Sequence, residues 1–178
     1  MNASYEIEIS NQQDRDVKKE PLVEVIRSIL LDHEFQTAEI SVALVDDPSI
    51  RQLNLQYLQH DYETDVISFV LDESTEFRSL SGQLVVSTDT AFRFANELNC
   101  PWQDELLLYV VHGMLHLVGY RDKNPQQVSE MRQQEKKYLA RLGISPVWRS
   151  TETDESLGSL PSQSDQQSTG IHPEEDSE

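Results

Sequence analysis

Residues 106–120 read LLLYVVHGMLHLVGY, a nearly unbroken apolar stretch that contains two histidines. Apolar residues on every side predict a helix that is buried in the middle of its domain, over about residues 103–118. Gly119 follows, and glycine is the residue type that most often ends a helix in the left-handed conformation. The rest of the fold is therefore expected to pack around this helix.

The two histidines predict a metal site. His112 and His116 are four residues apart, so both imidazoles project from the same side of the helix and can meet on one ion. Asp122 arrives just beyond the turn at Gly119 and adds a carboxylate. Three protein ligands leave one coordination position for water, as in catalytic zinc sites, and this metal-bound water is the expected attacking group. The alternative for the pair is two histidines in the core or on the surface that are hydrogen-bonded without a metal.

Gly113, between the histidines, bears on both the packing and the enzyme class. Glycine in a helix interior costs about 1 kcal/mol relative to alanine, which favours a close approach of backbone or ligand at this position. Zinc proteases of the His-Glu-x-x-His type place their general base here. Gly113 cannot serve as a base, so the sequence excludes that class.

The hydrophobic pattern outside this helix alternates between the periods of strands and helices. Strands are expected near residues 5–9, 39–45, 65–71 and 82–86, and further helices begin near residues 21, 47, 88 and 125. The strand at 65–71 is almost continuously apolar, which favours a central position. Glu130 and Glu135 among the bases of the last helix indicate a solvated charged stripe. The predicted fold class is α+β, a mixed four-stranded sheet covered by about five helices, with the metal site on the central buried helix.

Composition divides the chain into two regions. Of 178 residues, 32 are acidic and 14 are Lys or Arg, for a formal net charge of −18. Residues 149–178 are rich in Ser, Gln and acids and contain almost no large apolar residues, so we expect a disordered acidic tail after a domain at 1–148. Cys100 is the one cysteine, which excludes an internal disulfide. With neither a secretory signal nor an apolar stretch of about 20 residues, the expected compartment is the cytoplasm and no membrane partner is expected.

Several segments carry a resemblance to a known family. The run His112-Gly-Met-Leu-His-Leu-Val-Gly-Tyr120 closely resembles the YbeY signature His-Gly-x-Leu-His-Leu-x-Gly-Tyr-Asp-His. Leu53-Asn54-x-x-Tyr57, Thr64-Asp65-Val-Ile-Ser-Phe69 and Gly82-x-Leu-Val-Val-Ser87 also match family segments. The resemblance spans about residues 1–146 and implies that residues 1–148 form a YbeY-like metal-dependent hydrolase domain.

Three positions depart from the family pattern. Asp122 replaces the histidine that is the family's third metal ligand, Leu58 replaces an arginine thought to grip phosphate, and Gln83 replaces an acid. A carboxylate ligand still suits zinc, but it adds negative charge and should leave the bound water less acidic. Two histidines and a carboxylate are also the non-haem iron pattern, so another divalent metal remains an alternative.

The resemblance implies a metal-dependent, single-strand-directed endoribonuclease that acts in ribosomal RNA maturation and ribosome biogenesis. Zinc is the expected cofactor, ribosomal RNA and the small ribosomal subunit are the expected partners, and DNA binding is not expected. Arg121 and Lys123 flank Asp122 and are predicted to contact RNA phosphate, with solvated turn charges as the alternative. A non-catalytic assembly factor of the small subunit with a structural metal is the rival hypothesis. Non-haem iron oxygenase chemistry is a third, based on ligand types alone.

Overall fold

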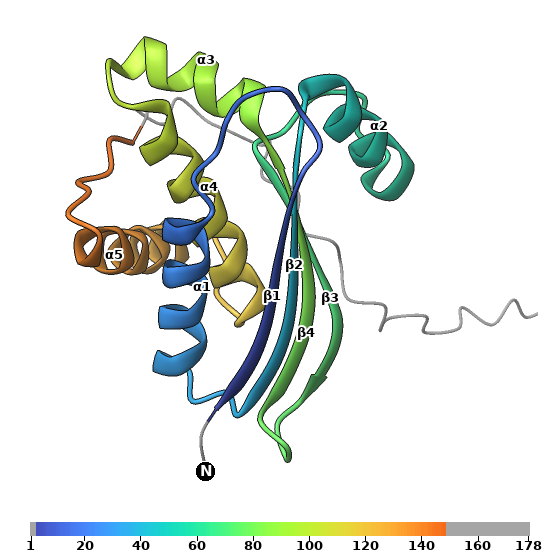
Figure 1. The fold of residues 1–178 in the computed structure, drawn as a ribbon, viewed down its shortest axis with the longest axis vertical. Coiled ribbons are helices and arrows are strands. Elements are labelled where there is room, and N and C mark those ends of the chain that lie inside the picture. Colours follow the sequence, from blue (N-terminus) through green and yellow to red (C-terminus); the bar gives the residue numbers. More distant parts are fainter. Residues whose placement is uncertain (1–2, 149–178) are drawn as a thin grey trace, which may run out of the picture.

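The computed structural model describes residues 3–148. Within them four strands form one sheet, and the five helices are distributed so that both faces of the sheet carry helices (Figure 1). The predicted tail at 149–178 lies outside the described residues. In chain order the elements are β1 (Ser4–Asn11), α1 (Glu20–Asp32), β2 (Thr37–Val45), α2 (Asp47–Leu58), β3 (Val66–Ser74), β4 (Ser79–Ser87), α3 (Thr88–Leu98), α4 (Trp102–Leu117) and α5 (Pro125–Arg141).

The sheet is mixed, as predicted, and the α+β fold class is confirmed. Its strand order is β1-β2-β4-β3, with β1 parallel to β2, β2 parallel to β4, and β3 antiparallel to β4. The predicted central position of the 65–71 strand is wrong, because β3 lies at the edge and pairs with β4 on one side. Val66 faces α4 and Ile67 faces α2, so helices cover both faces of this edge strand and both residues are buried. Its apolar run therefore reflects cover by helices rather than a neighbour strand on each side.

Helix α4 occupies the centre of the main core. It lies with α1 and α5 on one side of the sheet, and α3 leads into it (Figure 1). Its buried residues lie all around the helix, which matches the predicted apolar character. None of the described helices combines the length and the apolar character that crossing a bilayer requires.

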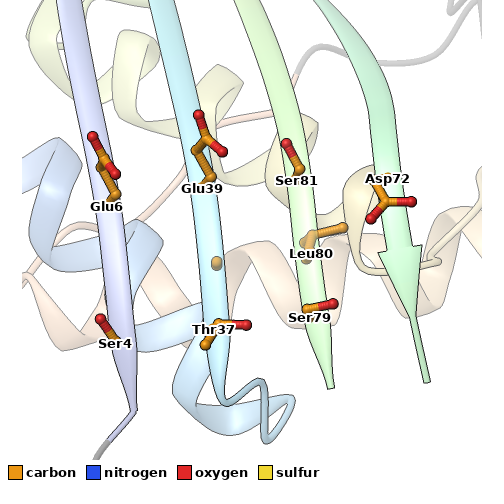
Figure 2. A pocket seen from close by; sticks show the side chains of 9 residues that line it. Ser4, Glu6, Thr37, Glu39, Asp72, Ser79, Leu80 and Ser81 are labelled. Atoms are coloured by element: carbon orange, nitrogen blue, oxygen red, sulfur yellow. The ribbon is translucent and has the colours of Figure 1, made fainter. Parts of the chain in front are cut away.

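Helix α2 covers only one end of the opposite face of the sheet. Ile50 packs there in a small second core with Val45, Ile67 and Val85. Further along the strands this face is polar, and Figure 2 shows residues of all four strands side by side across a shallow pocket of about 300 Å³. This polar surface explains the alternating pattern of β1, whose Glu6 points to this face while Ile7 packs on the main core.

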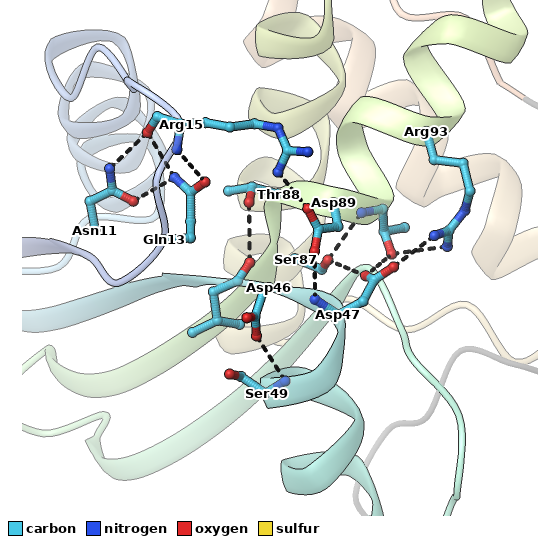
Figure 3. Close-up of polar contacts among 12 residues, drawn as sticks. Asn11, Gln13, Arg15, Asp46, Asp47, Ser49, Ser87, Thr88, Asp89 and Arg93 are labelled. Atoms are coloured by element: carbon cyan, nitrogen blue, oxygen red, sulfur yellow. Dashed lines mark hydrogen bonds and ion pairs between the residues drawn. The ribbon is translucent and has the colours of Figure 1, made fainter.

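A network of hydrogen bonds fixes the start of α2 to the start of α3 (Figure 3). The carboxylate of Asp47 accepts hydrogen bonds from Ser87 Oγ at 2.5 Å, Thr90 Oγ1 at 2.7 Å and Arg93 Nη1 at 2.7 Å. Asp89 accepts in turn from the backbone N–H of Asp47 at 3.1 Å. These contacts hold both helix starts at the same end of the sheet.

Candidate metal centre

Gly113 lets α4 lie directly against the sheet. A Cβ atom at this position would lie 2.9 Å from Leu84 Cδ2, 2.9 Å from Val66 Cγ2 and 3.1 Å from Ser68 Oγ. Ser68 also donates a hydrogen bond to the Gly113 carbonyl at 3.1 Å. The predicted close approach at Gly113 is therefore confirmed. While Gly113 lies against β3 and β4, the side chain of its neighbour His112 contacts Glu135 of α5.

The turn after α4 returns the chain to the histidines. Gly119 has φ +105°, in the left-handed region predicted for it, and nothing lies within 4 Å of a Cβ built there. The Tyr120 N–H then bonds to the Leu115 carbonyl at 2.9 Å. Arg121 Nη1 donates to the carbonyls of His116 at 3.2 Å and Tyr120 at 2.8 Å. These bonds shape a turn that places Asp122 beside both imidazoles.

The three predicted ligand atoms come together as one group. His112 Nε2 lies 3.0 Å from His116 Nε2, and Asp122 Oδ2 lies 3.6 Å from the first nitrogen and 3.5 Å from the second. Ligand bonds of 2.0–2.1 Å in a tetrahedral zinc site place neighbouring ligand atoms about 3.3 Å apart. The spacing of His112, His116 and Asp122 thus fits one small cation, and the group is a possible metal-binding site.

Hydrogen bonds to the other ring nitrogens fix which nitrogen faces the group. His112 Nδ1 lies 2.7 Å from Glu135 Oε1, and His116 Nδ1 lies 3.1 Å from the Tyr120 carbonyl. Both acceptors require a proton on Nδ1, so both Nε2 atoms of the neutral rings present lone pairs. Asp122 Oδ2 is buried and has no hydrogen-bond partner among the described residues. Three acceptors that face one another without a donor are stabilised by a cation between them.

Charges around the group shift two pKa values in opposite directions. Burial lowers the pKa of His112, but the hydrogen bond and charge of Glu135, with smaller contributions from Asp65 and Asp122, raise it above the usual 6.5. Burial raises the pKa of Asp122, but its contact with His116 and the charges of both imidazoles lower it below the usual 3.8. Asp122 is therefore held as a carboxylate, which is the form that binds a metal.

Glu135 is a buried neighbour of the candidate site that the sequence pattern did not indicate. The predicted solvated stripe is wrong at this position, because Glu135 is only 4% exposed and contacts His112. Its second oxygen accepts a hydrogen bond from Trp148 Nε1 at 2.8 Å. The signal that could have identified it is its helical spacing, since Met131, Glu135 and Leu139 share one buried face of α5.

The remaining predicted residues lie around the site in different ways. Arg121 and Lys123 are exposed on either side of Asp122. Leu58 packs against the small core under α2. Gln83 is half-buried on the face of the sheet that carries α2, opposite Phe69 in the strand register. The structure thus packs Leu58 as a half-buried apolar side chain rather than as part of the metal group.

Comparisons with known proteins identify the family and agree with this fold. The family model described as "Endoribonuclease YbeY" matches residues 7–143. Relatives of that name are 35% identical in Chloroherpeton thalassium, over 75% of this chain and 93% of the relative, and 38% identical in Bacteroides fragilis, over 70% and 88%. The solution structure of TM1509 from Thermotoga maritima superposes with a TM-score of 0.58 and 30% identity, covering 76% of this chain and 88% of that one. The chain belongs to the YbeY endoribonuclease family.

Proposed function

We propose that this chain is a metal-dependent endoribonuclease that cleaves single-stranded RNA during ribosomal RNA maturation, with residues 1–148 as its hydrolase domain. The convergence of His112 Nε2, His116 Nε2 and Asp122 Oδ2 carries this proposal. Family membership supplies the reaction class, because the matching relatives are named as endoribonucleases. Ribosomal RNA in the small subunit is the proposed substrate, and the cytoplasm, where the lone Cys100 stays reduced, is the proposed compartment.

Zinc is the proposed ion, held by His112, His116 and Asp122. Two imidazoles and one carboxylate are a ligand set that hydrolytic zinc sites use, and hydrolysis needs no change of redox state. When bound there, a divalent ion supplies Lewis-acid activation of water and neutralises charge at the phosphodiester. Iron in place of zinc in the purified protein would favour the non-haem iron alternative.

The chain's own residues define the setting for this reaction. Glu135 and the Tyr120 carbonyl hold the two imidazoles with Nε2 directed at the third ligand. Leu58 carries no charge at the position where the family pattern has an arginine that would bind phosphate. The positive charges nearest Asp122 in sequence, Arg121 and Lys123, are therefore the proposed phosphate contacts. Replacing both by alanine should weaken RNA binding and flatten its dependence on salt, whereas an unchanged salt series would contradict this assignment.

A cleavage assay with a matched variant tests the proposed activity. The full chain, loaded with Zn²⁺, should cut a single-stranded RNA and leave a duplex of the same sequence intact. His116→Ala removes one ligand from a half-buried position and should abolish cleavage. Equal cleavage by both proteins would assign the activity to a contaminant and contradict the proposal.

A non-catalytic assembly factor is the second candidate, and Leu58 is the observation that favours it. This candidate predicts that His116→Ala binds the small ribosomal subunit as tightly as the unaltered chain and that neither protein cuts RNA. Loss of cleavage with retained subunit binding supports the nuclease, and absence of cleavage in both supports the assembly factor.

A further inference from the structure

We infer that Trp148, acting through Glu135, is a positioning residue of the metal centre, so that the segment after α5 sets how tightly α4 holds its ion. The inference rests on the metal site of the proposed function but not on RNA cleavage. It assigns a role to a residue that lies well outside the histidine motif.

The contacts form a continuous chain of three side chains. Glu135 Oε1 lies 2.7 Å from His112 Nδ1, and Glu135 Oε2 lies 2.8 Å from Trp148 Nε1. An indole N–H only donates and an ionised carboxylate only accepts, so the directions of both bonds are fixed. Glu135 is 4% exposed, and these two donors give each of its carboxylate oxygens a partner in place of water.

Trp148 is held in place by its own packing. Its ring lies against the main core together with Leu142 and Ile144, which precede it in the segment after α5. The guanidinium carbon of Arg132 lies 5.8 Å from the ring centroid, which adds a cation–π contact from α5. A ring held on several sides offers its N–H from a fixed point.

A fixed second oxygen matters because a carboxylate with one partner can rotate. Because Oε2 of Glu135 is bound to Trp148, the carboxylate cannot rotate and its Oε1 stays directed at His112 Nδ1. That bond keeps the proton on Nδ1 and turns Nε2 toward His116 and Asp122. The indole therefore fixes the ligand indirectly, through orientation and tautomer, without touching the ion.

Trp148→Phe tests this role because it removes the N–H and keeps an aromatic ring. Zn²⁺ affinity of the full chain, measured by competition with a chromophoric chelator, should fall about 10-fold. Trp102→Phe is the matched control, since Trp102 is the other tryptophan and contacts Phe92 at the far end of α4 from His116. The visible spectrum of the Co²⁺-loaded chain should shift in the Trp148 variant and stay unchanged in the control.

A double-variant cycle separates positioning from packing. Glu135→Gln has one side-chain acceptor for two donors, so either His112 or Trp148 loses its partner. This change should cost about 100-fold in Zn²⁺ affinity in the unaltered chain, but only about 10-fold in the Trp148→Phe background, where the amide oxygen is free for His112. Equal costs in both backgrounds would overturn the inference.

The remaining outcomes distinguish this inference from the proposed function. If the unaltered chain binds no Zn²⁺, both fail. If it binds Zn²⁺ and Trp148→Phe stays within about twofold of it, the inference fails and the metal site stands. Equal losses in Trp148→Phe and Trp102→Phe would also overturn the inference, because a general loss of stability would then explain them.

Discussion

Asp122 determines the charge of the candidate centre. It contributes a carboxylate where the family pattern has a neutral imidazole, and its Oδ2 lies about equally far from both histidine nitrogens, at 3.6 and 3.5 Å. A carboxylate ligand offsets part of the positive charge of a divalent ion, whereas an imidazole does not. The identity of this one side chain should therefore influence the pH at which RNA is cut.

Asp122→His tests that effect directly. The substitution leaves more positive charge at the centre, so ionisation of water there becomes easier. The acid limb of the pH–rate profile for RNA cleavage should move to lower pH relative to the unaltered chain. A profile that stays in place, with Zn²⁺ still bound, would show that Asp122 does not set the charge of the reacting group.

The two shifted pKa values predict how the metal-free protein responds to pH. The pKa of His112 is raised above 6.5 in the folded state, so its contribution to stability is full below that value and is lost as pH rises through the folded pKa. The pKa of Asp122 is lowered, so its contribution is present above 3.8 and is lost as pH falls through the folded pKa. Urea unfolding of the metal-free chain should therefore show less stability at alkaline pH than between these limits.

Glu135→Gln is the control for this pH dependence. The substitution removes the charge that raises the pKa of His112, so the loss of stability at alkaline pH should shrink. Metal binding should show the reverse trend, since protons compete with the ion for His112, and Zn²⁺ affinity should rise with pH. An unchanged alkaline loss in the variant would assign it to another group.

The candidate ligands and the residues that contact them differ in how far their positions follow from the sequence. His112 and His116 lie one helical turn apart and Asp122 follows a glycine turn, so their approach depends on local geometry. Glu135 comes from another helix, and charged neighbours on α5 concealed its buried position. Its partner Trp148 lies after the end of α5, and only tertiary packing brings the two together.

At the scale of elements, the contact between α4 and the sheet depends on Gly113. Alanine there improves helix propensity by about 1 kcal/mol, but its Cβ would lie within 3 Å of Leu84 and Val66. Val66 is a β-branched residue in a strand and cannot easily move aside. The steric cost of the added Cβ should therefore exceed the gain in helix propensity. Gly113→Ala should lower the free energy of unfolding by about 1–2 kcal/mol.

Urea unfolding of two variants checks this prediction. Gln133→Ala, at an exposed position of α5, is the comparison and should change stability by less than about 0.5 kcal/mol. If Gly113→Ala is as stable as the unaltered chain, the close packing of α4 on β3 is not required. Zn²⁺ affinity should fall with the same variant, because His112 is the neighbouring residue and moves with the helix backbone.

The edge position of β3 shows what periodicity leaves open. A strand reads as continuously apolar when both faces are covered, and covering by α4 and α2 gives the same pattern as a central position. The helices were predictable because each has a strong apolar stripe or a proline near its start. Strand order depends on contacts between distant segments and so was not readable from the sequence.

At the scale of the whole molecule, the contact of Trp148 with Glu135 makes Trp148 the expected functional end of the domain. We propose that residues 1–148 fold and bind the ion without the acidic segment at 149–178. A chain ending at Trp148 should retain the Zn²⁺ affinity of the full chain, while a chain ending at Val147 should lose about 10-fold. Chelator competition on the two truncated chains measures the difference, and equal affinities would move the boundary away from Trp148.

Metal content of the purified full chain shows whether His112, His116 and Asp122 hold an ion together. Elemental analysis after Zn²⁺ loading and removal of excess metal should give one ion per chain, and Asp122→Ala and His116→Ala should each retain almost none. Asp104→Ala, which removes a half-buried acid at the start of α4, should keep the full content. If Asp122→Ala keeps as much zinc as the unaltered chain, the three side chains do not form one metal centre.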